Sequence, residues 1–430
     1  MTGMGSDTHM SCPTEERESA LPSERVSASP SYGLSMMSPS SMRNKKRPYV
    51  MVQQNCIPHY RLLLFELLST DKQIRFRVIA DENSDVPFLA VIRPEETVID
   101  LKVARVRTLF LSMPFNLTWQ PSAVAEVLRE RPDLVIVQGS PYSLTAWVLV
   151  LLGRTCRIPV LLWTHGLLGQ ERGVRWRIRE TLYRLSSGLL LYGDRAQSLL
   201  VEKGFPCERL HVVYNSVGAS RSDRVVPSPE ACLEFRTNLG IKTGERLVIF
   251  SGRLQREKQI PLLFQAIAGM KGNQRTVHVC LVGDGTEQDR LYRLADELGI
   301  RDLVHFLGPI YEESKLGLVF SASDLSVIPA AAGLSIIHAM TYGTPVLLHG
   351  NVEEHGPEWE AVMEGVTGFF FKHGNADDLA QKAMMALFPE PLKEKMAQAC
   401  REVVEHRYTT SRHAQAIKDA VRATLMSRKA

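Results

Sequence analysis

The stretch of sequence that decides the fold reads Arg246-Leu247-Val248-Ile249-Phe250-Ser251-Gly252-Arg253-Leu254, with Lys258 four residues further on. Residues 246–250 form an apolar run typical of a buried strand, and Ile260 to Met270 has the apolar pattern of a helix. Ligands of open α/β sheets bind outside the carboxyl ends of the strands. Because this strand ends in Gly-Arg and turns toward a helix preceded by Lys, Arg253 and Lys258 are predicted to face a diphosphate.

Two further strand ends follow in the same half of the chain. The apolar run Val277–Val282 ends in Gly283-Asp284-Gly285, and Pro329 to Leu334 leads into another predicted helix. The two glycines, Gly283 and Gly285, either contact the ligand or only make a tight strand-to-helix turn. Asp284 and Thr286 are predicted to cap the helix that follows them.

Strand patterns alternate with helical patterns from Pro48 onward, which is typical of parallel sheets with crossover helices. The first half predicts strands at Tyr49–Gln53, Ile74–Ala80, Thr108–Leu111, Leu134–Gln138, Val160–Thr164, Leu189–Tyr192 and Val212–Tyr214. The second half predicts strands near Leu247–Ser251, Val277–Val282, Val304–Leu307, Leu325–Ile328, Val346–His349 and Phe369–Phe371. The predicted fold class is therefore α/β, with two Rossmann-like, doubly wound parallel-sheet domains.

A polar, unpatterned break at Ser216 to Glu230 divides these two halves. The predicted organisation is a Ser/Pro/Met-rich disordered leader at 1–47, a first domain at 48–217, a linker at 218–230, a second domain at 231–406, and a C-terminal helix at 407–430 that crosses back to the first domain. Two α/β units joined by one linker predict a cleft between them, which is a favoured place for ligands.

The composition is that of an ordinary globular protein, with 430 residues, 44% of them hydrophobic and 23% charged. The net charge of +4 does not indicate a nucleic-acid partner. Seven scattered cysteines without CxxC spacing predict a reduced compartment, no disulfide framework and no zinc site.

The chain starts without the apolar segment of a signal peptide, and its longest apolar run, Leu144 to Leu152, is shorter than the roughly 20 residues of a membrane span. These features predict a cytoplasmic protein, at most peripheral to the inner face of a membrane.

Four motifs in this order resemble the group-1 (family 4) glycosyltransferases of the GT-B fold: Gly252-Arg253-Leu254 with Glu257-Lys258, Leu281 to Gly285, Pro329 to Val346, and Glu364 to Phe369. The resemblance is specific in the second half and looser from Pro48 to Asn215. It implies a retaining transfer of a sugar from a UDP- or GDP-linked donor to a glycan or lipid-linked acceptor, in surface polysaccharide biosynthesis. It also implies that no metal and no other cofactor are required.

By this resemblance the second domain binds the donor. Arg253 and Lys258 hold its diphosphate beside Gly252, and the backbone amides of Gly333 and Leu334 also face it. The physical argument agrees, because a helix N-terminus offers free N–H groups and the positive end of the helix dipole to phosphate. Both cations would also stabilise the leaving diphosphate as its charge develops.

The sequence departs from the family at two positions. The family usually places two glutamates eight positions apart here, the first touching the donor sugar and the second the ribose, and the matching residues are Ala330 and His338. His338 can still hydrogen-bond to a ribose hydroxyl, whereas Ala330 replaces nothing. We hypothesise that a carboxylate from the loop after Val346–His349 fills the gap, with three candidates: Glu353, Glu354 and Glu358.

The first half offers its own candidates. His165 follows the predicted strand Val160–Thr164, and the resemblance implies that a histidine there faces the donor sugar. It can stabilise developing positive charge or orient a hydroxyl, and a capping or core role stays open. Tyr60 and Arg61, in the first strand-to-helix loop, are candidate neighbours of the donor or the acceptor. Asn215 matches a loop asparagine of the family and is assigned no chemical role.

The segment Arg172 to Leu185 has the pattern of a basic amphipathic helix, with Val174 and Ile178 on the apolar face and arginines around the rest. It is either a solvated helix of the first domain or a docking surface for an anionic membrane that carries a lipid-linked acceptor.

Functions of different classes remain open. The motifs favour a glycosyltransferase, but the loss of both family glutamates favours a non-catalytic nucleotide-sugar-binding or scaffold subunit. A nucleotide-sugar epimerase of similar two-domain build fits the Gly252 to Lys258 motif poorly.

Overall fold

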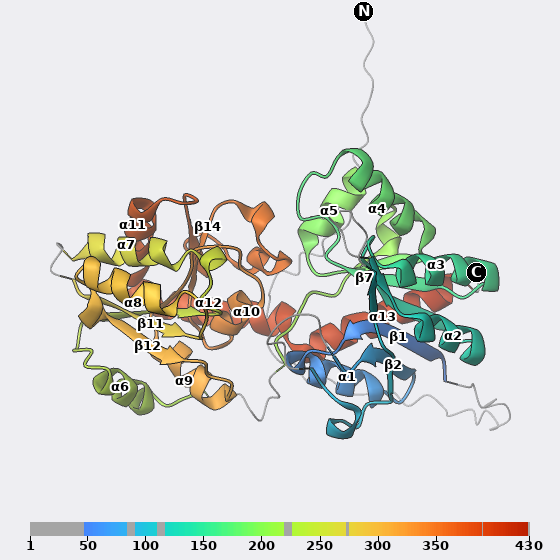
Figure 1. Cartoon of the computed structure of the whole chain (residues 1–430), viewed down its shortest axis with the longest axis horizontal. Coiled ribbons are helices and arrows are strands. Elements are labelled where there is room, and N and C mark those ends of the chain that lie inside the picture. Colours follow the sequence, from blue (N-terminus) through green and yellow to red (C-terminus); the bar gives the residue numbers. More distant parts are fainter. Residues whose placement is uncertain are drawn as a thin grey trace, which may run out of the picture. The chain divides into compact units, whose positions relative to one another are not determined.

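The computed structural model describes residues 47–83, 91–109, 117–218, 226–271, 275–388 and 390–428. Residues 1–46 of the predicted leader and 219–225 of the predicted linker lie outside these ranges. The described ranges form a seven-stranded and a six-stranded parallel sheet, together with a short antiparallel pair (Figure 1). The predicted α/β class, with two parallel sheets and helices packed against them, is confirmed.

The first sheet has the strand order β3-β2-β1-β6-β7-β8-β9. Its strands are β1 (Tyr49–Cys56), β2 (Arg75–Asp81), β3 (Leu101–Val103), β6 (Leu134–Gln138), β7 (Val160–Thr164), β8 (Gly188–Leu191) and β9 (Leu210–Val212). The chain builds outward from β1 through β2 to β3, and then returns to add β6 on the other side of β1. The reversal makes the space beyond the ends of β1 and β6 the topological switch point of this sheet.

Both faces of the first sheet are covered by helices, as its near-continuous apolar strands require. Successive side chains of a strand point to opposite faces, so Val50 and Val52 pack on one side and Met51 on the other. The first side carries α1 (Leu62–Ser69) and α13 (Thr410–Ser427), and Ile417 and Val421 of α13 join its core. The second side carries α2 (Pro121–Glu130), α3 (Leu144–Cys156), α4 (Gly173–Leu185) and α5 (Asp194–Glu202).

The second sheet has the strand order β12-β11-β10-β13-β14-β15, with its switch point between β10 and β13. Its strands are β10 (Arg246–Ser251), β11 (Val277–Val282), β12 (Val304–Gly308), β13 (Leu325–Ile328), β14 (Val346–His349) and β15 (Gly368–Phe371). One face packs against α7 (Ile260–Met270), α8 (Gln288–Glu297) and α11 (Ala376–Leu387). The other packs against α6 (Pro229–Asn238), α9 (Glu313–Ala322), α10 (Leu334–Thr341) and α12 (Glu390–Val403).

Short helical turns occupy several loops of the described chain: η1 (His59–Arg61), η2 (Pro94–Glu96), η3 (Cys207–Arg209), η4 (Arg256–Lys258), η5 (Arg301–Leu303), η6 (Val352–Glu354), η7 (Pro357–Ala361) and the π-helical turn η8 (Val404–Tyr408). No helix within the described ranges combines the length and the apolarity needed to cross a bilayer.

Two local predictions are wrong. The strand expected at Thr108–Leu111 is β4 (Arg107–Leu109), which pairs antiparallel with β5 (Leu117–Trp119) outside the parallel sheet. Neither Asp284 nor Thr286 caps α8, because that helix starts three residues after Gly285 and its N-cap, Glu287, makes no side-chain cap. The backbone N–H of Glu287 instead donates to the carbonyl of Leu254, so a contact between loops holds this turn.

Candidate functional site

The glycines at the ends of β10 and β11 allow two strand-end turns to touch. A Cβ on Gly283, whose φ is +134°, would lie 2.0 Å from the carbonyl oxygen of Gly252. A Cβ on Gly285 would lie 2.3 Å from the carbonyl oxygen of Leu254. The backbone N–H of Leu254 donates to the carbonyl of Asp284 over 2.7 Å. These contacts give Gly283 and Gly285 a structural role in the close approach of the two turns, and contact of either glycine with a ligand stays a prediction.

Replacing Gly283 by alanine is expected to lower the free energy of unfolding by about 3 kcal/mol or more, because a methyl group would meet backbone that has no room to move and φ would be strained. Gly374→Ala is the matched control, since Gly374 also has a positive φ of +70° but open space around it. The control is expected to cost about 1–2 kcal/mol. Urea unfolding midpoints measure both, and equal losses in the two variants would contradict the close approach.

The two predicted phosphate cations lie at the same turn. Arg253 is exposed at the end of β10, and Lys258, the last residue of η4, is partly buried. The Lys258 Nζ lies 3.4 Å from the carbonyl oxygen of Ala331, in the turn between β13 and α10. Burial, followed by the charge of Arg253, lowers the pKa of Lys258 below its usual value. Two mutually repelling cations therefore stand at the switch point of the second sheet, an arrangement that an anion would stabilise.

The start of α10 completes this cationic corner. Its N-cap is Gly333, and within the described residues no side chain caps its first turn. Gly333 and Leu334 are both partly exposed. The free N–H groups and the positive end of the helix dipole thus remain available on the side where Lys258 contacts the preceding turn.

The residue at the predicted ribose position is already engaged. His338 of α10 lies with its Nε2 2.9 Å from Glu313 Oε1, at the start of α9. The hydroxyl of Tyr342 donates to the same carboxylate oxygen over 2.6 Å. Glu313 was not predicted from the sequence, because it precedes His338 by 25 residues and carries no motif of its own. The structure thus places a carboxylate beside the histidine that stands where the family usually has glutamate.

One of the three candidate glutamates lies close to the α10 start. Glu358, in η7, is 2% exposed, and its Oε2 would lie 3.8 Å from a Cβ on Gly333. The Nδ2 of Asn215 donates to Glu358 Oε1 over 2.7 Å. Burial raises the pKa of Glu358, while the Asn215 hydrogen bond and the charge of Arg61 act in the opposite direction. Asn215, to which the sequence assigned no chemical role, therefore orients this carboxylate.

The other two glutamates are more exposed. The Glu353 side chain is 56% exposed and lies 3.9 Å from the Arg195 guanidinium. The Glu354 side chain is 49% exposed and points to two histidines rather than to α10. Ala330 is buried, with 4% of its surface exposed. Glu358 is thus the best placed of the three to supply the carboxylate that Ala330 lacks.

The first-sheet candidates gather at the carboxyl ends of β1, β7 and β8. Arg61 donates from Nη2 to the Tyr192 hydroxyl over 2.7 Å, and its guanidinium lies 5.2 Å from the Trp163 ring centroid. The His165 ring lies 4.9 Å from the ring of Tyr192. The surrounding protein, followed by the charges of Arg61 and Arg179, lowers the pKa of His165 to about 4, although the residue is exposed to solvent. His165 is therefore neutral at physiological pH. Tyr60 is 36% exposed next to Arg61.

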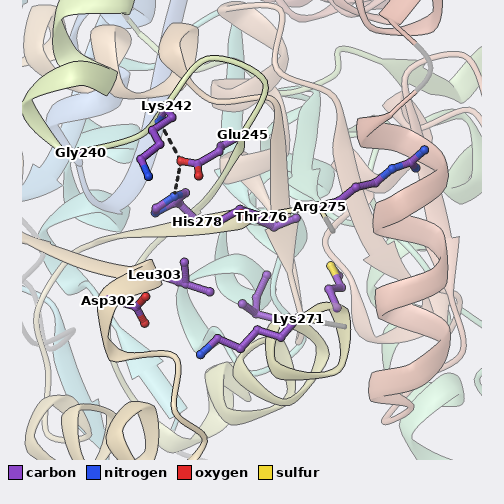
Figure 2. A pocket seen from close by; sticks show the side chains of 12 residues that line it. Gly240, Lys242, Glu245, Lys271, Arg275, Thr276, His278, Asp302 and Leu303 are labelled. Atoms are coloured by element: carbon purple, nitrogen blue, oxygen red, sulfur yellow. Dashed lines mark hydrogen bonds and ion pairs between the residues drawn. The ribbon is translucent and has the colours of Figure 1, made fainter. Parts of the chain in front are cut away.

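A separate pocket of about 500 Å³ lies at the opposite, amino end of the second sheet (Figure 2). Its lining includes His278, at the second position of β11, whose Nε2 lies 3.0 Å from Glu245 Oε2, and Lys242, whose backbone N–H donates to that same oxygen. Because ligands of open α/β sheets bind at the carboxyl ends, this pocket is not the candidate site despite its volume.

Two glycosyltransferase family models match different parts of the chain. Residues 233–403 match the profile of the family Glycosyl transferases group 1, and residues 70–216 match Glycosyl transferase 4-like domain. An uncharacterized glycosyltransferase of Methanocaldococcus jannaschii is 24% identical over 331 residues, which cover 73% of this chain and 82% of the relative. D-inositol 3-phosphate glycosyltransferase of Mycolicibacterium smegmatis is 32% identical over 216 residues, about half of each chain (48% and 49%).

Among solved structures, HepE of Anabaena in complex with UDP matches with a TM-score of 0.67 and 21% identity, over 87% of this chain and 100% of that one. At this identity the likeness shows the fold.

Proposed function

The chain is a glycosyltransferase of group 1 with the GT-B fold, and from this premise we propose that it transfers a sugar, with retention of configuration, from a UDP- or GDP-linked donor to a glycan or lipid-linked acceptor of a surface polysaccharide. One observation carries the donor half of this proposal: Arg253, Lys258 and the uncapped start of α10 converge at the switch point between β10 and β13. A diphosphate is the ligand whose charge such a corner best complements.

Each other part of the donor has a proposed partner. His338 and Glu313 together bind the ribose hydroxyls, with the imidazole and the carboxylate offering a donor and an acceptor 2.9 Å apart. Glu358 contacts the transferred sugar in place of the glutamate that Ala330 replaces. HepE of Anabaena, whose structure was solved with UDP, supports a nucleotide ligand for this fold.

The chemistry of transfer follows from charge. As the bond between sugar and diphosphate breaks, negative charge grows on the diphosphate and positive charge on the sugar. Arg253, Lys258 and the α10 dipole stabilise the first charge. Neutral His165 adds no positive charge against the second, and its imidazole or backbone can orient a hydroxyl of the donor sugar. The proposed scheme uses no metal.

Release of nucleoside diphosphate tests the proposal directly. The full chain is incubated with UDP- and GDP-sugars, with and without acceptor extracts, and UDP or GDP is quantified. Release above the rate without enzyme is the expected result. Tight donor binding without release, even with acceptor extracts, would instead favour the non-catalytic nucleotide-sugar-binding subunit, which the alanine at position 330 favours.

The exposed face of α4 favours docking on an anionic membrane as the route to a lipid-linked acceptor. Val174 and Ile178 are 71% and 42% exposed although Leu182, on the same face, is buried. Arg172 and Arg177 are exposed beside them. Apolar side chains surrounded by arginines suit the boundary between anionic headgroups and acyl chains.

Neutralising this face is expected to weaken vesicle binding. An arginine near an anionic surface contributes about 1 kcal/mol, so the double variant Arg172→Gln/Arg177→Gln should lose about 30-fold in partitioning onto anionic vesicles. Arg290→Gln/Arg293→Gln on α8 removes the same charge from another exposed helix and should bind like the parent protein. Flotation at low and moderate salt measures both. If the parent protein does not bind anionic vesicles, α4 is only a solvated helix.

A further inference from the structure

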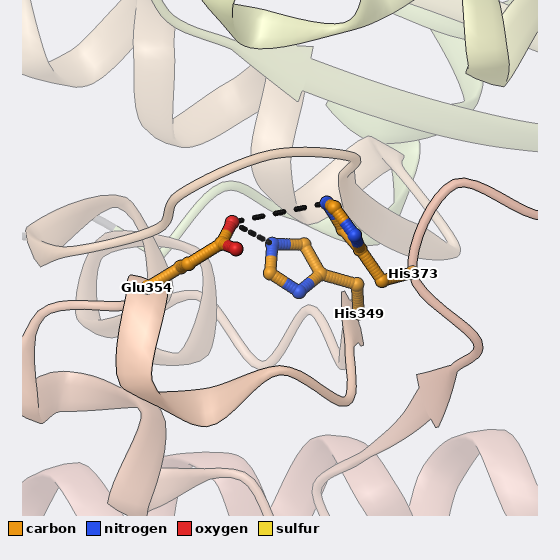
Figure 3. Close-up of side chains that lie close together, drawn as sticks. All are labelled: His349, Glu354 and His373. Atoms are coloured by element: carbon orange, nitrogen blue, oxygen red, sulfur yellow. Dashed lines mark ion pairs between the residues drawn. The ribbon is translucent and has the colours of Figure 1, made fainter. Parts of the chain in front are cut away.

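Three potential metal ligands meet at the carboxyl edge of the second sheet, outside the cationic corner formed by Arg253, Lys258 and the start of α10. His349 is the last residue of β14, and His373 follows β15 by two residues. These strands are hydrogen-bonded neighbours in which His349 pairs with Phe371, so the sheet itself brings the two histidines side by side. The third residue, Glu354, is delivered by η6. Figure 3 shows the carboxylate facing both imidazoles.

The buried member of this cluster has an unused nitrogen. His349 is 0% exposed, and within the described residues its Nε2 has no hydrogen-bond partner. Its nearest opposite charge, Glu354 Oε2, is 3.9 Å away, and the same oxygen lies 3.8 Å from His373 Nε2. Both separations are too long for hydrogen bonds. A buried imidazole nitrogen that lacks a partner is costly unless something else binds it.

The spacing suits an ion between the three side chains. Their ligand atoms all lie within 4.8 Å of one another, so a point equidistant from them is about 2.5 Å from each. Bonds from zinc to histidine nitrogen or carboxylate oxygen are about 2.0–2.2 Å. An inward shift of about 0.4 Å per side chain closes that gap. The side chains of Glu354 and His373 are 49% and 41% exposed, so both can shift inward by this distance.

We propose that His349, Glu354 and His373 bind a divalent transition-metal ion, with zinc the best match to two imidazoles and one carboxylate. The fourth position of a tetrahedral ion is left for water or another ligand. No zinc site was predicted from the sequence because its cysteines lack CxxC spacing. The three ligands proposed here lie in separate loops without a recognisable spacing of their own. The inference stands independently of the proposed transferase activity, since it rests on the cluster alone.

The surrounding contacts both support the site and set a requirement. The side chain of Asn351 donates from Nδ2 to Glu354 Oε1 over 2.7 Å, which orients the carboxylate as outer ligand contacts commonly do. The backbone N–H of Asn351 points to His349 Nδ1 over a long 3.3 Å. Metal binding at Nε2 needs the proton on Nδ1, so this weak contact must open as the metal binds.

The ion would brace the turn that precedes α10. His355, next to Glu354, accepts through Nδ1 a hydrogen bond from the backbone N–H of Ala332 over 3.1 Å, and the N–H of Gly356 donates to the Ala332 carbonyl over 2.7 Å. Fixing η6 to the ends of β14 and β15 therefore fixes the loop that holds the Ala332 turn. The proposed role of the ion is to hold this turn in position, and that role does not require contact between the ion and the donor.

Zinc binding to the full chain, without a histidine tag, tests the proposal. Protein stripped with a chelator and dialysed is titrated with zinc chloride by calorimetry, and its metal content is measured after removal of free ion. One equivalent is expected to bind and to raise the unfolding midpoint by several degrees, and the chelator should reverse the shift. His373→Ala and Glu354→Gln, both in exposed side chains, should each weaken binding by at least about tenfold.

Two variants outside the cluster serve as controls. Glu353→Gln changes the neighbouring glutamate and His406→Ala removes an exposed histidine of η8, and both should bind one equivalent like the parent. Visible absorption of bound cobalt(II), tested in parallel, should be lost in His373→Ala and kept in His406→Ala. The proposal is overturned if the parent protein binds no zinc, or if its zinc binding survives both cluster substitutions unchanged.

Discussion

Replacing Arg253 by alanine is expected to lower kcat/KM for nucleotide-sugar turnover by about 10²–10³-fold, because removing one preorganised donor from developing charge typically costs that much. Most of the loss should appear in kcat, since the charge on the leaving diphosphate is greater in the transition state than in the bound donor. Nucleoside diphosphate release at several donor concentrations measures both constants. Lys258→Ala should act in the same direction, and the double variant should lose less than the product of the two, because both cations serve one diphosphate.

Arg256→Ala is the matched control for this experiment. Arg256 lies three residues after Arg253, in η4, and like Arg253 it is exposed, but the contact with the Ala331 carbonyl comes from Lys258. It should change kcat/KM by less than about threefold. If Arg253→Ala and Arg256→Ala behave alike, Arg253 contributes only to the general positive charge of this surface. The proposal that the cationic corner binds a diphosphate then loses its support.

Much of the fold was predictable because local signals agree with each other in this chain. The apolar run before Gly252 is typical of a buried strand and forms β10. The helix predicted at Ile260–Met270 has those bounds in the structure. Thr108–Leu111 failed because period and propensity identify a strand but not its partner. The same limit explains Asp284 and Thr286, whose capping was inferred from residue type, whereas a carbonyl of a distant loop satisfies the turn instead.

The candidate site was predictable only where a motif is contiguous. Arg253 and Lys258 lie five residues apart, so the turn that brings them together can be foreseen. Glu313 meets His338 across two helices, and Asn215 meets Glu358 from 143 residues away. Such contacts depend on how elements pack, which no local pattern encodes. The three ligands proposed for zinc were missed for the same reason.

Changing Glu358 to glutamine is expected to reduce kcat by about 100-fold without unfolding the protein. The amide keeps an oxygen that can accept the hydrogen bond of Asn215 Nδ2, now 2.7 Å from Glu358 Oε1, while the charge is lost. A carboxylate close to the reacting sugar stabilises its developing positive charge, and a neutral amide does so only weakly. Donor turnover and the unfolding midpoint, measured on the same preparation, separate a loss of chemistry from a loss of structure.

The pH dependence gives a second, independent readout. Burial raises the pKa of Glu358 above its usual value near 4.5. If the ionised form is the active one, activity must fall as pH drops through this raised pKa, at a higher pH than for an ordinary glutamate. Glutamine cannot titrate, so the acidic limb should disappear in Glu358→Gln and persist in the control Glu353→Gln, whose side chain is 56% exposed. A full-activity Glu358→Gln enzyme with an unchanged acidic limb would mean that Ala330 has no substitute carboxylate in this loop.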